Sequence, residues 1–230
     1  MQLSDLLLAA GITMFCIAFA QQFMKSYKEE AFGRAFWLKG SAALSFVSLG
    51  ILLAPFCPNP GYARLVVIGL ALGLCGDQLL ALRFLVPKLH DLMFAAGAGA
   101  FGVGHFFYMK ALYDLGSIRL GVLIPVFLIG VAIANLYGKK HGSNAGPLQF
   151  AGLGYMVLVI FMGAVSVSAF LGAPGIGLAL FALGGICFGV SDNILFAFCY
   201  GKMPQWRMNV WVHITYYAAQ LLIAWSIFFI

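Results

Sequence analysis

The chain has 230 residues, of which 63% are hydrophobic and only 9% are charged. Soluble domains carry about 25% charged residues, so this composition excludes a water-soluble globule and indicates a polytopic membrane protein. The net charge is +6, but we expect no nucleic-acid partner, because the distribution of the basic residues reports membrane topology. The five cysteines show no C-x-x-C or zinc-like spacing, so we expect small packed residues and neither a disulfide framework nor a metal site.

Eight apolar runs follow one another along the chain, separated by turns rich in Gly, Pro, Asn and Lys. Runs of about 20 apolar residues predict transmembrane helices. We therefore expect an all-α fold, a polytopic transmembrane helical bundle that forms a single integral membrane domain over residues 1–230. The predicted spans are 4–23, 36–54, 64–83, 91–111, 118–137, 148–170, 176–199 and 208–230.

Basic residues are distributed unevenly among the predicted loops. The first, third, fifth and seventh loops, with the adjoining helix ends, hold Lys25, Lys28, Arg34, Lys39, Arg83, Lys88, Lys139, Lys140, Lys202 and Arg207. The opposite loops hold only Arg64, Lys110 and Arg119. Because Lys and Arg concentrate in cytoplasmic loops, both termini are predicted to be extracytoplasmic. The absence of eukaryotic tails and targeting signals favours a bacterial cytoplasmic (inner) membrane.

The third and seventh predicted spans resemble each other. Residues 69–82 and 185–198 each contain Gly-x-x-x-Gly followed by an aspartate, Asp77 or Asp192. His105 lies 28 residues after Asp77, and Gln220 lies 28 residues after Asp192. This pattern indicates two four-helix halves offset by about 115 residues, and an even number of helices per half predicts a parallel repeat. The alternative is a chance resemblance among Gly-rich apolar helices.

Two of the seven acidic residues, Asp77 and Asp192, fall inside predicted spans. A carboxylate at a helix centre costs about 2.5–3.5 kcal/mol on insertion scales, so such residues usually face the bundle interior and mark a site. The alternative is that the two acids only form packing hydrogen bonds between helices. Helical spacing places further polar residues on inward faces of the fourth and eighth spans: His105, Tyr108, His213, Tyr216 or Tyr217, and Gln220.

Three kinds of chemistry fit this polar group. Buried acids can perform acid–base hydrolysis, or they can form an ion or proton relay in a transporter. A metal site from Asp77, His105, Asp192 and His213 is the third option, but no H-x-x-x-H or H-E-x-x-H spacing supports it. At about 1.5 Å per residue, Asp77 would lie roughly 9 Å and Asp192 about 10–12 Å below the cytoplasmic helix ends.

Four motifs, in this order along the chain, resemble the YhhN family of integral membrane proteins, the lysoplasmalogenase family. They are Gly76-Asp77 with Leu80; Gly99-x-Phe101-x-x-x-His105-x-x-Tyr108; Gly185-x-x-Phe188-x-x-Ser191-Asp192-x-x-Leu195; and Tyr216-Tyr217-x-Ala219-Gln220. Lys39, Tyr155 and Met162 also look like family positions. The resemblance extends from about residue 30 to the C-terminal end. Gly104 and Asn193 depart from the expected pattern.

The resemblance implies a hydrolase that cleaves the vinyl ether of lysoplasmalogens into a fatty aldehyde and glycerophosphoethanolamine or glycerophosphocholine. The expected partners are this lysophospholipid substrate and membrane lipids, with no cofactor. Asp192 is expected to be the acid and Asp77 the carboxylate that stabilises the cation or directs water, although these roles could be exchanged. A small-solute or proton-coupled transporter remains the alternative. His105 completes the expected catalytic set, and the expected substrate-binding set is Lys39, Tyr108, Tyr155, Ser191, Tyr216, Tyr217 and Gln220.

In that scheme each supporting residue has an expected task. His105, Tyr216 and Gln220 orient the acids, and Lys39 holds the substrate phosphate as a point charge. Lys39 could instead only extend to the lipid headgroups. Ser191 is expected to be a hydrogen-bond partner and not a nucleophile, because the chain has no G-x-S-x-G motif.

Overall fold

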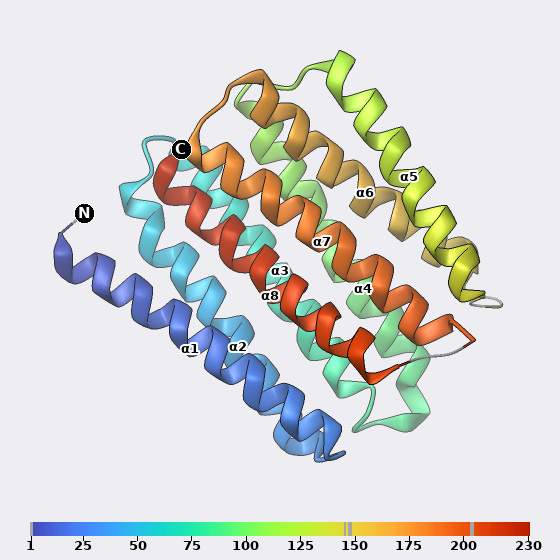
Figure 1. The fold of residues 1–230 in the computed structure, drawn as a ribbon. Helices are drawn as coiled ribbons and strands as arrows, with labels where there is room; N and C mark the ends of the chain where they lie inside the picture. The colour runs from blue at the N-terminus through green and yellow to red at the C-terminus, as the bar shows by residue number, and fades with distance from the viewer. Residues whose placement is uncertain (1, 145, 147–148, 203–204) are drawn as a thin grey trace. The chain divides into compact units, whose positions relative to one another are not determined.

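The computed structural model describes residues 2–144, 146, 149–202 and 205–230. Within these residues the fold is all-helical and contains no strand (Figure 1). Eight helices are long and apolar enough to cross a membrane, which confirms the predicted all-α transmembrane fold. They are α1 (Leu3–Lys28), α2 (Phe32–Leu53), α3 (Pro60–Leu82), α4 (His90–Asp114), α5 (Leu120–His141), α6 (Gln149–Gly172), α7 (Ile176–Tyr200) and α8 (Trp206–Phe229).

Most helices extend beyond the apolar runs that predicted them. The first run ends at residue 23, but α1 continues to Lys28, because polar residues with good helix propensity can continue a helix at the membrane boundary. The start of α3 shows the expected boundary chemistry: the Asn59 side chain accepts a hydrogen bond from the Tyr62 N–H at 3.0 Å, and Pro60 is the first helical residue. The predicted start of the sixth span, at residue 148, lies outside the described residues, as do parts of the predicted turns before the sixth and eighth spans.

The chain divides into two compact units. Unit 1 is Met1–Ala111 with Ile227–Ile230, so it contains α1 to α3 and nearly all of α4. Unit 2 is Leu112–Ser226 and contains α5 to α7 with most of α8. This division falls close to the boundary that the sequence predicts for two four-helix halves.

In unit 1, α2 packs against both α1 and α3 (Figure 1). Small residues bring α3 and α4 close together: a Cβ added to Gly76 would meet the Phe101 ring at 2.6 Å, and one added to Gly69 would collide with Tyr108. A Cβ on Gly104 would lie 3.2 Å from the Gly69 carbonyl oxygen. The backbone approach therefore explains why Gly stands at position 104, one of the two departures from the family pattern.

In unit 2, α6 packs against α5 and α7 (Figure 1). Gly185 of α7 faces Ser166 of α6, where an added Cβ would collide with the hydroxyl. On α7, a Cβ at Gly184 would lie 3.0 Å from the Ala219 carbonyl oxygen of α8. These glycines let three helices approach closely around the segment that carries Asp192.

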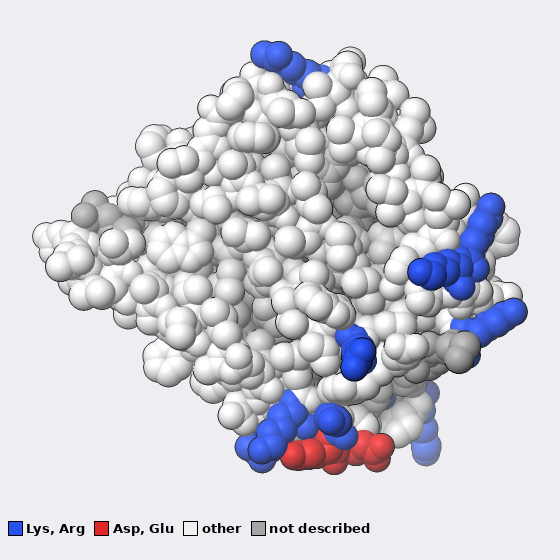
Figure 2. Space-filling view, in the orientation of Figure 1, with Lys and Arg blue, Asp and Glu red and all other residues white. Residues whose placement is uncertain are grey.

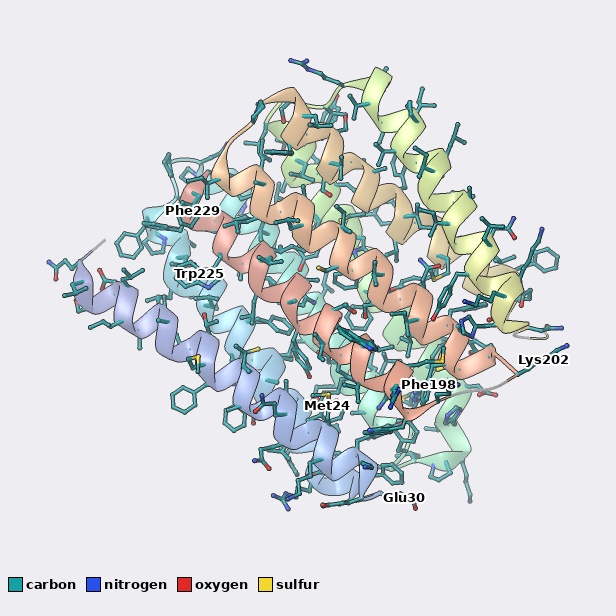
Figure 3. All side chains as sticks on the ribbon, viewed as in Figure 1. Met24, Glu30, Phe198, Lys202, Trp225 and Phe229 are labelled. Atoms are coloured by element: carbon teal, nitrogen blue, oxygen red, sulfur yellow. The ribbon has the colours of Figure 1, made fainter. Side chains whose placement is uncertain are left out.

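The surface has the composition expected of a protein in a bilayer. Most of the face in Figure 2 is uncharged, and α5 exposes large apolar side chains such as Leu128, Ile129 and Ile133. The two charged residues labelled in Figure 3 lie at helix ends: Glu30 is in the turn between α1 and α2, and Lys202 lies two residues after the end of α7. Eight apolar helices with such a surface fit an integral multi-pass membrane protein.

Candidate active site

Asp77 of α3 forms a buried ion pair with Lys39 of α2. The Lys39 Nζ lies 3.0 Å from the Asp77 Oδ1, and the two side chains are 9% and 2% exposed. The same ammonium lies 5.6 Å from the centre of the Phe23 ring. A buried charge needs a paired partner, so Lys39 supplies the positive charge that stabilises the ionised form of Asp77. Lys39 thus has an anionic partner within the protein, which the sequence did not predict.

A glycine follows Lys39 where α2 contacts α3. A Cβ at Gly40 would lie 2.6 Å from the Gln78 Nε2, next to Asp77 on α3. A larger residue at this position would therefore require the end of the Gln78 side chain to move.

His105 and Tyr108 lie on a buried part of α4, and each residue is 1% exposed. Their ring centres are 6.2 Å apart. Tyr108 packs against Gly69 of α3, and Phe101 packs against Gly76, directly before Asp77. Unit 1 therefore contains four of the predicted site residues on three neighbouring helices: Lys39, Asp77, His105 and Tyr108.

Asp192 of α7 is 6% exposed and also receives a partner from the preceding helix. The Tyr155 hydroxyl of α6 donates a hydrogen bond of 2.6 Å to the Asp192 Oδ2. A phenol is neutral, and it can donate to a carboxylate or to the carbonyl oxygen of a protonated carboxyl group. This bond fixes the orientation of the carboxyl group within unit 2 and is compatible with a bound proton.

The neighbours of Asp192 on α7 serve the packing of the helix. The Ser191 hydroxyl donates to the Val212 carbonyl oxygen of α8 at 3.0 Å. The Asn193 side chain donates to the Gly189 carbonyl oxygen, on its own helix, at 2.8 Å. Ser191 is a hydrogen-bond donor, as predicted, but the acceptor that the structure identifies is a backbone group on another helix.

The predicted polar residues of α8 form a connected row. Gln220 donates from Nε2 to the Tyr216 hydroxyl at 3.1 Å. The Tyr216 ring makes an edge contact with Phe188 of α7 at 5.5 Å and contacts the Tyr217 ring at 5.1 Å. The His213 Nδ1 lies 2.7 Å from the Asn209 carbonyl oxygen, so Nδ1 carries the hydrogen of this bond.

Tyr155 shows what the residue pattern alone missed. It was singled out only through the family resemblance, because one tyrosine in an apolar helix is not a pattern. A signal existed in the spacing: Lys39 precedes Asp77 by 38 residues, and Tyr155 precedes Asp192 by 37. The repeat offset of 115 residues maps Lys39 onto Gly154, so the spacing indicates the neighbourhood of Tyr155 but not Tyr155 itself.

Each unit thus contains one buried carboxyl group with a partner from the preceding helix. Asp77 is paired with an ammonium, whereas Asp192 accepts a hydrogen bond from a phenol. No group of three or more His, Cys, Asp or Glu is placed to hold a metal ion in the described parts of the chain.

Comparison with known protein families identifies one match. The family model of the YhhN family matches residues 34–227, a range that contains every site residue from Lys39 to Gln220. No curated protein and no solved structure matches the chain. Because the family model spans most of the sequence, the chain belongs to the YhhN family.

Proposed function

We propose that this protein is a lysoplasmalogenase, a hydrolase that cleaves the vinyl ether of lysoplasmalogens within the membrane. The YhhN family is associated with this activity. The observation that carries the proposal is the buried Asp192, which accepts the 2.6 Å hydrogen bond from Tyr155. Vinyl ether hydrolysis begins with proton transfer to carbon, so it needs a positioned acid and no serine nucleophile.

The reaction adds one water molecule to the substrate. The acid delivers a proton to the vinyl carbon that is not bonded to oxygen, and the electrons of the double bond form the new C–H bond. The other vinyl carbon becomes an oxocarbenium ion. Water adds to that carbon and loses a proton, giving a hemiacetal, which breaks its bond to the glycerol oxygen. The products are a fatty aldehyde and glycerophosphoethanolamine or glycerophosphocholine.

Asp192 is the proton donor in this proposal. The hydrogen bond from Tyr155 occupies Oδ2, so the proton to be transferred resides on Oδ1. Burial disfavours a charged carboxylate, so a buried carboxyl group can keep its proton at neutral pH and deliver it to carbon as a positioned general acid. After the transfer, Tyr155 stabilises the new carboxylate by the same hydrogen bond.

Asp77 supplies the negative charge that the oxocarbenium ion requires. Lys39 keeps it ionised before the reaction, and a fixed anion in a site of low dielectric constant stabilises a developing cation strongly. The pairing also changes the expected task of Lys39. Its ammonium already serves Asp77, so we assign Lys39 to the carboxylate, and the substrate phosphate requires another cation.

The deciding experiment is turnover by purified protein in detergent. Aldehyde should be released from a vinyl-ether lysophospholipid, and in D₂O the aldehyde should carry one deuterium on the carbon next to the carbonyl. The corresponding alkyl-ether lipid, which has no double bond to protonate, should not react. Absence of turnover, together with acid-dependent solute flux in proteoliposomes, would instead support the transporter alternative.

The proposed location is the bacterial cytoplasmic membrane, with both termini extracytoplasmic. The asymmetry of Lys and Arg among the loops supports this topology. Reporter fusions after residues 28 and 140 should give cytoplasmic signals, and fusions after 60 and 230 should not. A cytoplasmic signal at 60 or 230 would contradict the proposed topology.

A further inference from the structure

Arg83, which caps the C-terminal end of α3, has a guanidinium group held between aromatic rings. Its central carbon lies 4.6 Å from the ring centre of Phe84 and 5.1 Å from that of Phe94. Phe84 in turn stacks on Phe32 at 5.1 Å and makes an edge contact with Tyr27 at 5.3 Å. All of these residues belong to unit 1. The rings therefore hold the planar cation in a defined orientation.

The guanidinium group of Arg83 keeps a donor that is not used within the described residues. Its Nε is buried without a hydrogen-bond partner, and the residue forms no ion pair with any acid that the structure describes. The nearby acid in the first turn of α4, Asp91, is 3.0 Å from the His90 Nδ1. A guanidinium has five N–H donors in a fixed fork, so this partly buried group is prepared for an anion from outside the chain.

The depth of Arg83 suits the headgroup of the proposed substrate. Arg83 follows Asp77 by six residues on the same helix, which is a rise of roughly 9 Å. In an extended lysoplasmalogen, the phosphorus and the vinyl ether are separated by the glycerol carbons, a distance of roughly 8 Å at ordinary bond lengths. A lipid with its vinyl ether at the level of Asp77 would therefore bring its phosphate to the level of Arg83.

Resting on the proposed function, we propose that Arg83 binds the phosphodiester of the lysophospholipid substrate. Two guanidinium N–H groups donate to the two non-bridging phosphate oxygens. Phe84 and Phe94 fix the guanidinium plane so that this fork is ordered before the lipid arrives. Lys39 meanwhile remains with Asp77, and the two cations of unit 1 have separate tasks.

The test measures binding, so that it does not depend on turnover. The probes are an alkyl-ether lysophosphocholine, which cannot be hydrolysed, and the matching alkylglycerol, which lacks the phosphate. Arg83→Gln should weaken binding of the lysophosphocholine by about 10- to 100-fold, as expected for charged hydrogen bonds, and leave the alkylglycerol affinity unchanged. Arg83→Lys should give a smaller loss, because it keeps the charge and loses the fork. Arg64→Gln, at the exposed opposite end of α3, is the control and should bind both probes as wild type does.

Three results would overturn the assignment. The first is an Arg83→Gln affinity for lysophosphocholine within twofold of wild type. The second is an equal loss for both probes, which would indicate a structural effect. The third is an equal loss for a diacyl phosphatidylcholine, which would indicate a contact with bulk membrane lipid. If Arg83→Gln does not fold, an unchanged affinity in Arg83→Lys overturns the assignment.

The same proteins separate this inference from the proposed function. If wild type releases aldehyde and Arg83→Gln keeps its KM, the assignment of Arg83 fails while the activity stands. If wild type releases no aldehyde but binds the lysophosphocholine through Arg83, the phosphate site stands and the hydrolase proposal fails.

Discussion

Asp77 in unit 1 and Asp192 in unit 2 occupy matching places but meet different partners. Each lies on the third helix of its unit and contacts a residue of the second helix. Asp77 meets the ammonium of Lys39 at 3.0 Å, and Asp192 meets the phenol of Tyr155 at 2.6 Å. The ammonium favours an anion, whereas the phenol can donate to either protonation state. One helical arrangement therefore gives the two carboxyl groups different partners, and the opposite tasks proposed for them, an anion in unit 1 and a proton donor in unit 2, rest on this difference.

The matching partners also extend the internal resemblance of the sequence. The repeat was first indicated by Gly-x-x-x-Gly and an aspartate in residues 69–82 and 185–198. The structure adds the partners from α2 and α6, at nearly the same separation from each acid. Polar pairing between the second and third helices is thus a shared feature of the two units, and the parallel relation of the halves stays a prediction.

The largest effect should come from replacing the proposed proton donor. Asp192→Asn keeps the size of the side chain and a hydrogen-bond acceptor for Tyr155, but it removes the acidic proton. Aldehyde release should fall by roughly 10²–10⁴-fold, as is typical when a general acid is lost. The protein should still fold, because an amide costs less to bury than a carboxylate. The measurement is the initial rate per amount of monodisperse protein.

The matched control is Asp5→Asn, at the exposed start of α1, where the carboxylate accepts from the Gln2 N–H. Its rate should remain near that of wild type. If Asp192→Asn also turns over at that rate, Asp192 only connects helices, and His105 would become the next candidate for the proton donor.

Asp77→Asn should reduce both activity and stability, which separates it from Asp192→Asn. The change leaves the Lys39 ammonium buried without the carboxylate, and breaking a buried pair costs about 3–5 kcal/mol of unfolding free energy. Thermal unfolding in detergent measures that loss. A double variant, Lys39→Met with Asp77→Leu, should regain stability because it removes both charges, but it should not regain aldehyde release. If the double variant regains aldehyde release, the Asp77 carboxylate is not required for the reaction.

Removing the partner of each acid tests whether Asp77 and Asp192 differ in charge. Tyr155→Phe deletes one neutral donor, so it should cost about 1 kcal/mol of stability and reduce turnover by about tenfold at most. Lys39→Met leaves a buried carboxylate without its ammonium and should cost about 3–5 kcal/mol. Equal losses in the two variants, compared by thermal unfolding in one detergent, would show that the two acids do not differ in charge.

The smallest effect is expected at Ser191, beside Asp192. Its hydroxyl donates to the Val212 carbonyl oxygen, so Ser191→Ala should cost about 1 kcal/mol and change turnover by less than about threefold. A loss as large as that of Asp192→Asn would point to a serine nucleophile. In that case an acetal adduct, formed when the Ser191 hydroxyl adds to the oxocarbenium carbon and loses its proton, should be detectable by mass spectrometry.

The sequence predicted the fold well because bilayer spans leave long apolar runs, and both buried acids stood out within them. It could not predict which partner each acid meets. Lys39 lies near a span end, where a lysine can extend to lipid headgroups or turn inward, and the local sequence does not decide between them. The structure shows the inward position, with the ammonium paired to Asp77. Arg83 was counted solely as a topology signal. Its aromatic contacts depend on how Phe84 and Phe94, from the connection and the start of α4, fold around it, which local sequence does not encode.

The protonation state of the two carboxyl groups can be measured directly by infrared difference spectroscopy on purified protein at neutral pH. The spectrum of wild type minus Asp192→Asn should contain the carbonyl stretch of a protonated carboxyl group, and that band should shift in D₂O. The spectrum of wild type minus Asp77→Asn should contain only ionised carboxylate bands. A protonated band that disappears in Asp77→Asn but persists in Asp192→Asn would contradict the division of tasks between the two units.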